Sequence, residues 1–436
     1  MGKLRYGLYL GATALAGASS GFSTSAHAQG APAANPLPMF DSVTAMGQEL
    51  GKNGVYLSLG YVEDFSWLTS GGIPGHTGGY PIGHATAGLT LDMQTIAGIT
   101  GGSLHVIFEE RNGTGLGNAS GINSVPIQAD AGPVKYRLSQ FYWEQAFYQD
   151  RIDIQVGRTE PTLEFAISDI SCQFVASVIC AQPGTWYFSN ANGAYPAAEW
   201  GGRVNLAVTP QIYVKAGIYQ DTPVGTGFMD AGFDWRTAGS TGVFSIAELG
   251  YLTGFSDVQL PAKYDAGFYY DTSSYTKGSQ PATGFNGEQG RNAGYIQLQQ
   301  TVWRPDMATH QSLTAFAGAI LYSGSAPYRG QYYAGLFDRA PLGALRPADT
   351  IGVITTLVDI NTSATGAHHD QEWITEVNYG IGLIQGVTLK PYFQYISNPF
   401  NQSAPNANSK NAVIVGAQFS IALEQLLNFP VFVPHD

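Results

Sequence analysis

Residues 137–157 read RLSQFYWEQAFYQDRIDIQVG, two strand-like stretches joined by a very short turn. In the second stretch, three apolar residues alternate with three polar ones: Ile152, Ile154 and Val156 with Arg151, Asp153 and Gln155. A period of two places apolar side chains on one face of a β-strand and polar side chains on the other. The turn at Gln149-Asp150 leaves almost no loop, as in an antiparallel hairpin. The segment therefore predicts two paired antiparallel strands.

Similar segments continue along the chain in both directions. We expect about 16 strands, near residues 54–62, 84–93, 103–111, 137–147, 151–158, 199–208, 211–219, 243–252, 262–270, 292–303, 312–321, 331–337, 351–359, 371–381, 387–396 and 412–421. Long and short connections alternate between them, except around 322–350. Outer-membrane barrels combine short periplasmic turns with longer external loops. The predicted fold class is therefore all-β, a transmembrane antiparallel β-barrel.

The composition agrees with a barrel in lipid. Charged residues make up 12% of the chain, about half the roughly 25% of soluble domains. The 25 Tyr and 55 Gly residues suit a wall that is apolar outside and polar inside. The net charge of −12 argues against nucleic acid as a partner, because nucleic acid requires clustered Lys and Arg. The expected location is the outer membrane of a Gram-negative bacterium, with outer-membrane lipid as a partner.

The N-terminus has the three parts of a secretory signal. Lys3 and Arg5 precede a short apolar run, and Ala26-His27-Ala28 forms an A-x-A cleavage site. We expect residues 1–28 to be removed as a signal peptide.

The rest of the chain divides into two parts. Residues 29–53 would form a periplasmic segment with a possible short helix at 41–50, capped by Asp41 or Ser42 and stopped by Gly51. Residues 54–436 would form the barrel.

Cys172 and Cys180 are the two cysteines of the chain. Export through the periplasm favours a disulfide bond between them, with two free thiols as the alternative.

Several motifs, taken in order, resemble the carbohydrate-selective porins of the OprB type. They are RLSQFYWEQAF (137–147), IDIQVGR (152–158), Glu164-Phe165-Ala166, Tyr195-Pro196, Trp200-Gly201, and PYFQY (391–395) with Asn398-Pro399 and residues 413–419. The likeness runs from about Gly47 to Phe419. It implies a sixteen-stranded, monomeric barrel that passes glucose and related sugars, with other small solutes, by diffusion.

The C-terminus departs from the usual barrel pattern. Such barrels end at an aromatic residue that closes the last strand, whereas here seventeen residues follow Phe419. Either the last strand lies near 429–433, or a tail follows residues 412–421.

A sugar pore needs hydrogen-bond donors, acceptors and flat aromatic faces. The candidate pore-lining residues are Glu109, Arg111, Glu144, Arg158, Glu160, Trp186, Glu199 and Arg203. Inward charge is also what any porin wall contains. Because a large barrel leaves a wide channel, we expect the long segment 159–198 to enter the lumen. It would meet the wall near Glu109, Arg111, Glu144 and Arg203.

Sequence signals for an enzyme or a metal site are weak. His368-His369-Asp370 lacks a third spaced metal ligand, and no phosphate loop is present. No catalytic residue, metal or cofactor is therefore expected. A lipase- or protease-type barrel enzyme and a plugged structural or adhesive barrel remain the alternatives.

Overall fold

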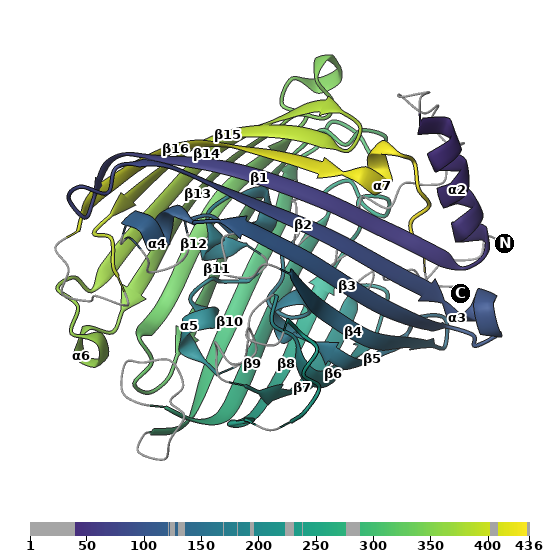
Figure 1. Ribbon diagram of the computed structural model, residues 1–436, viewed down its shortest axis with the longest axis horizontal. Helices are drawn as coiled ribbons and strands as arrows, with labels where there is room; N and C mark the ends of the chain where they lie inside the picture. The colour runs from purple at the N-terminus through teal and green to yellow at the C-terminus, as the bar shows by residue number, and fades with distance from the viewer. Residues whose placement is uncertain are drawn as a thin grey trace.

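The protein forms a closed barrel (Figure 1). The computed structural model describes residues 40–120, 122, 127–129, 136–168, 170–180, 182–191, 196–222, 231–237, 239–275, 288–401 and 409–433. Within these ranges sixteen antiparallel strands each pair with their neighbours in sequence, and β1 pairs with β16. The predicted antiparallel barrel and its strand number are confirmed.

The strands have the following bounds: β1 Val55–Gly72, β2 Gly78–Asp92, β3 Gly102–Gly113, β4 Tyr136–Phe147, β5 Ile152–Thr159, β6 Glu199–Ala207, β7 Ile212–Asp221, β8 Gly242–Leu252, β9 Ala262–Tyr275, β10 Glu288–Trp303, β11 Ser312–Tyr322, β12 Tyr328–Arg339, β13 Thr350–Ile360, β14 Gln371–Ile384, β15 Val387–Ser397 and β16 Lys410–Ala422. Short helices lie outside them: α2 Asp41–Lys52, α3 Met93–Ala97, α4 Leu116–Ser120, α5 Trp186–Ser189, α6 Thr362–Thr365, α7 Leu423–Leu426, and the 3-10 helices η2 Pro161–Leu163, η3 Ser171–Gln173, η4 Ser177–Ile179 and η5 Gly343–Leu345. Among the described residues, no helix has the length and apolar character needed to cross a membrane. The expected signal peptide, 1–28, lies outside the described residues.

The barrel wall is apolar outside. On β5, Val156 is 58% exposed, whereas Gln155 and Thr159 on the opposite face are buried. Ile218 and Leu249 continue the exposed apolar surface on β7 and β8. This arrangement reverses that of a soluble protein and is the one that a barrel in lipid requires.

The first hairpin is longer than the sequence predicted. Residues 63–83 were expected to be mostly a long external loop, but β1 and β2 pair continuously up to Leu68 and Gly78. The pattern is hidden because glycines replace outward side chains on β2. A Cβ on Gly79 would lie 2.5 Å from the Phe65 ring and 2.7 Å from the Trp67 ring, so glycine provides the space for these two aromatics.

The chain after the last strand returns to the N-terminal helix. β16 ends at Ala422, so the last strand lies near 412–421 and a tail follows it. Phe429 packs where Gly47 of α2 has no side chain, and the Phe432 ring meets Tyr56 edge-on at 5.3 Å. Helix α2 extends two residues beyond the predicted 41–50, and no side chain caps its start. The tail and α2 therefore form one packed unit at the end of the barrel where β1 begins (Figure 1).

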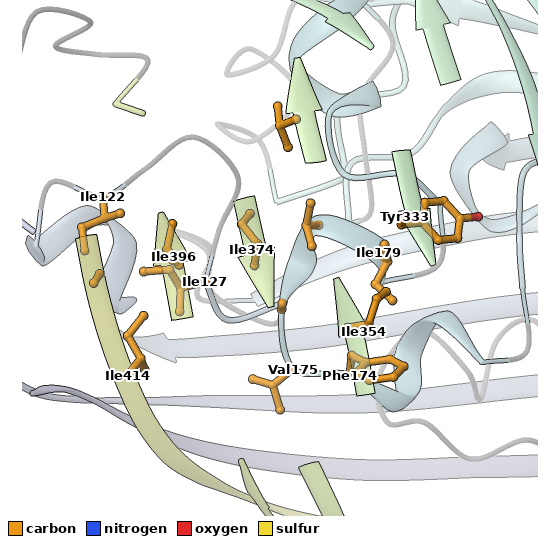
Figure 2. Packing of buried hydrophobic residues seen from close by; sticks show 14 of the residues in the cluster. Ile122, Ile127, Phe174, Val175, Ile179, Tyr333, Ile354, Ile374, Ile396 and Ile414 are labelled. Atoms are coloured by element: carbon orange, nitrogen blue, oxygen red, sulfur yellow. The ribbon is translucent and has the colours of Figure 1, made fainter. Parts of the chain in front are cut away.

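A hydrophobic core lies inside the lumen (Figure 2). The wall contributes inward-facing isoleucines: Ile354, Ile374, Ile396 and Ile414. The connection between β3 and β4 and the one between β5 and β6 contribute the residues that meet them: Ile122, Ile127, Phe174, Val175 and Ile179. Two connections therefore fold into the barrel and bury apolar surface there.

Candidate functional site

The segment 159–198 is held inside the lumen by lysines of the wall. Lys215 of β7 donates to the carbonyl of Glu164 at 2.7 Å. Lys263 of β9 donates to Ile167 O at 2.5 Å, and Lys390 of β15 donates to a carbonyl further along the segment at 3.0 Å. These donors come from widely separated strands. The prediction that this segment enters the lumen is confirmed for its described residues.

Carboxylates of the wall hold the same segment by its amides. Glu376 of β14 accepts from the N–H groups of Val175 and Ala176, at 2.9 and 2.7 Å. Glu248 accepts from Ala166 N at 2.9 Å. Side chains of the wall thus satisfy backbone groups that would otherwise be buried without partners.

Arg203 is the centre of the densest ionic contact. Its guanidinium reaches Glu144 at 2.7 Å, Asp153 at 2.5 Å and Glu164 of the inserted segment at 2.7 Å. The Arg203 side chain is 1% exposed. His105 lies 3.3 Å from the other oxygen of Glu144. The expected meeting of the segment with Glu144 and Arg203 is confirmed, but Arg203 is an anchor rather than an open donor.

Four other predicted residues form a second group, here called the outer cluster: Glu109, Arg111, Glu160 and Glu199. Arg111 Nε lies 3.4 Å from Glu109, whose other oxygen lies 3.1 Å from His84. Glu160, at the start of the inserted segment, interacts electrostatically with all three other members.

The outer cluster and burial change the pKa of two side chains of the inserted segment. Burial first, and then the carboxylates of Glu109 and Glu199, raise the pKa of the Glu160 carboxyl well above its usual range. Burial also raises the pKa of Tyr187 to about 12, with Arg111 acting in the opposite direction. The outer cluster therefore places one guanidinium group, that of Arg111, beside three carboxyl groups, and all four residues are largely buried.

Arg158 is not in the lumen, contrary to the prediction. It alternates on β5 with the inward-facing Gln155 and Thr159, so its side chain lies on the outer face. Its guanidinium donates to the carbonyls of Asp234 and Ala198, at 2.6 and 2.8 Å. The prediction failed because Arg158 was judged by its place before the long segment rather than by its parity in the strand.

Trp186 has no face open to a sugar. It is 0% exposed, and its ring packs at 4.9 Å from Tyr269 and 5.6 Å from Phe244. Trp186 therefore anchors the inserted segment in an aromatic cluster.

A second inserted connection was not predicted. Gln128, between β3 and β4, donates to Asp64 of β1 and to the carbonyl of Tyr80. Ala129 N donates to Val175 O at 2.9 Å, so the two inserted connections touch each other. Ile122 and Ile127 in a Gly/Asn-rich stretch were the available signal, because an external loop has little reason to contain them.

Cys172 and Cys180 are both partly buried. The disulfide stays a prediction. Among the described residues no group of three His, Cys, Asp or Glu side chains is arranged to hold a metal ion.

The chain is similar to known porins in both sequence and fold. A family model described as carbohydrate-selective porin, OprB family, matches residues 76–423. Porin B of Pseudomonas aeruginosa is 24% identical over 421 residues, with 87% of this chain and 90% of that protein covered.

Two solved structures of Pseudomonas putida OprB share the fold. The high-pH structure has a TM-score of 0.75 at 20% identity, with 86% of this chain and 95% of that chain covered. The low-pH structure has a TM-score of 0.55 at 18% identity, with 86% and 94% covered.

Proposed function

Because the chain belongs to the carbohydrate-selective porin, OprB family, we propose that sugars cross its barrel past the outer cluster, which sorts them by their hydroxyl groups. The protein is a sugar channel of the Gram-negative outer membrane, and its family implies a channel rather than an enzyme. The proposal concerns where along the lumen the sorting takes place.

The observation that supports this place is the mixture of charges in the outer cluster. Arg111 lies 3.4 Å from Glu109, and the register of β3 and β4 puts Arg137 opposite Glu109. A sugar hydroxyl both donates and accepts hydrogen bonds, so adjacent guanidinium and carboxylate groups replace part of its water shell. Interspersed charges of both signs also leave no strong field of one sign to concentrate ions. Such a passage suits neutral polar solutes.

The inserted segment supplies the narrowing. Glu160 and Tyr187 belong to it, and both interact electrostatically with Arg111 on the wall. We expect the solute path to run between these segment residues and strand β3.

The test is sugar flux into liposomes. Arg111→Ala should flatten the differences in swelling rate among sugars, while flux of a smaller neutral solute such as glycerol persists or rises. Arg329→Ala is the matched control, because Arg329 forms an exposed ion pair with Asp359 at 3.3 Å on the outer wall. If Arg111→Ala leaves the order and ratio of sugar rates unchanged, the outer cluster does not sort sugars.

Export and processing are a separate part of the proposal. The A-x-A site at Ala26-His27-Ala28 supports cleavage after Ala28. N-terminal sequencing of protein from outer membranes should begin at Gln29, and any other start contradicts it.

We also propose that the protein contains one disulfide bond and is a monomer. A periplasmic route supports a Cys172–Cys180 disulfide, and the family resemblance supports a monomer in the lipid. Mass spectrometry should find no alkylatable thiol in unreduced protein, and native mass spectrometry in detergent should give the mass of one chain.

A further inference from the structure

The connection between β7 and β8 packs on the outside of the barrel. Its residues 231–237, here called the strap, lie against strands β3 to β6. Ala231 O accepts from Leu138 N at 2.9 Å, and the Phe233 ring lies 6.4 Å from Phe108.

Trp235 makes the closest aromatic contacts of the strap. Its ring lies 5.2 Å from Phe141 and 6.1 Å from Trp200, two residues of the outer wall. The Trp200 indole donates to the carbonyl of Trp235 at 2.9 Å. These contacts fix the strap on the wall.

Arg158 lies between the strap and the base of the inserted segment. One guanidinium nitrogen donates to Asp234 O of the strap at 2.6 Å, and the other donates to Ala198 O at 2.8 Å. Ala198 is the last residue of the segment 159–198, and Glu199 of the outer cluster follows it. Arg158 itself directly precedes the segment, so its side chain joins the two ends of the segment.

We propose that Arg158 is a positioning residue for the constriction: by holding Ala198 to the strap, it sets the position of the inserted segment and of Glu199. The guanidinium touches the segment from outside the wall, so it influences the pore without lining it. The part of this inference that concerns sugar sorting rests on the proposed function, whereas the part that concerns pore width does not.

The physical reason lies in the cost of a charge on the lipid side. An uncovered guanidinium on the lipid-facing side of the wall is unfavourable, and hydrogen bonds to carbonyl oxygens lower that cost. Its planar fork can reach two carbonyls at once, which an ammonium group on a flexible stem does less well. Detaching the strap therefore exposes Arg158 and weakens its hold on Ala198. The outer strap and the inner constriction are coupled through this one side chain.

The experiment uses the full-length porin in planar bilayers. Arg158→Gln and Trp235→Ala, singly and together, are compared with Arg236→Gln. Arg236 is a strap arginine whose side chain is 78% exposed and pairs with Asp234, so it controls for the loss of one positive charge on the strap. Single-channel conductance, block of that conductance by glucose, and reversal potential are measured.

We expect Arg158→Gln to raise the conductance and to weaken glucose block by about threefold, the size of change known for positions coupled through a packed network. Trp235→Ala should act in the same direction, and the double variant should equal the stronger single one, because both break the same connection. Arg158→Lys should change the conductance and the glucose block in the same direction as Arg158→Gln, but by less. Arg236→Gln should behave as the unmodified protein.

The reversal potential distinguishes a residue that positions the inserted segment from a residue that lines the pore. Arg158→Gln should leave it unchanged, because the charge is outside the lumen, whereas Arg111→Gln should shift it. A comparable shift for both variants, additive effects in the double variant, or unchanged conductance in both singles would overturn the inference. If Arg158→Gln does not fold, Trp235→Ala still decides, since it leaves Arg158 in place. Failure of the sorting proposal alone would appear as unchanged sugar ratios in Arg111→Ala with the Arg158 conductance effect intact.

Discussion

The lumen wall over β3–β9 and the wall over β11–β16 hold the same inserted segment in different ways. On the first side the ionic contacts centre on Arg203, which joins Glu144, Asp153 and Glu164, and Trp186 of the segment packs on aromatic rings beside them. On the second side apolar wall residues such as Ile374 provide most of the contact with the segment (Figure 2), and Glu376 and Lys390 add hydrogen bonds to its backbone.

The two sides of the wall therefore contribute differently to holding the segment. Hydrophobic contact is non-directional and scales with buried area, so the second side supplies attachment. Ionic hydrogen bonds require defined distances and angles, so the first side supplies position. Apolar packing also excludes water. We therefore expect the solute path on the charged side, beside the outer cluster.

Deletion of residues 170–182 should have the largest effect, because it removes the part of the segment that packs on the apolar side. Single-channel conductance should rise about twofold or more, since a barrel of this size without an insert encloses a wide channel. Migration on unboiled denaturing gels should confirm that the barrel is closed. Unchanged conductance and sugar preference in a folded deletion variant would mean that this part does not narrow the pore.

Arg203→Ala should remove the ionic contacts that hold the segment on the charged side. Three buried carboxylates would lose their common partner, which costs about 3–5 kcal/mol for a buried ionic contact. The melting temperature should fall and the conductance should become noisier as Glu164 detaches. Arg329→Ala is the control, because its exposed ion pair with Asp359 should contribute less than about 1 kcal/mol. Equal losses in the two variants would show that Arg203 is not an anchor.

Ile374→Ala tests the apolar side. Truncating a buried isoleucine should lower the free energy of unfolding by about 2–4 kcal/mol through lost contact and a cavity. Salt should not change this loss, and it should change the loss in Arg203→Ala only slightly, because that ionic contact is buried. Val377→Ala on the same strand faces outward and is 41% exposed, so its effect should be smaller. Denaturant unfolding at low and high salt gives both comparisons.

Glu160→Gln should have the smallest effect and the opposite sign. The folded state raises the pKa of Glu160, so its stabilising contribution is present when the carboxyl is protonated and is lost as the pH rises through the folded-state pKa. The variant should therefore melt higher than the unmodified protein at about pH 7.5, and the difference should vanish near about pH 4. A melting difference that is the same at both pH values would contradict this assignment.

Parity within a strand could be predicted where the pattern was clear. Leu104, Val106 and Phe108 were expected opposite His105 and Glu109, and the structure has them so. The inward direction of Lys215 was also readable, because it alternates with Val214 on β7. The bond from Lys215 to the carbonyl of Glu164 could not be predicted from the sequence. The two residues lie 51 positions apart and meet only when the segment folds inward.

The errors came where local pattern and tertiary contact disagree. Arg158 faces outward because strand parity puts it there, and it is tolerated because the strap covers it. Trp186 was expected to face a sugar, but three aromatic rings of the wall surround it instead. A sequence does not say which distant loop will cover a side chain.

The sequence by itself determined the wall of this porin. Strand alternation, low charge and the spacing of turns are local properties, and each follows from a residue's immediate neighbours. The tertiary structure decided what fills the wall: two inserted connections, the shared partners of Arg203, and the strap outside Arg158. These depend on contacts between residues far apart in the chain, which form only once the barrel has closed and its inner face exists.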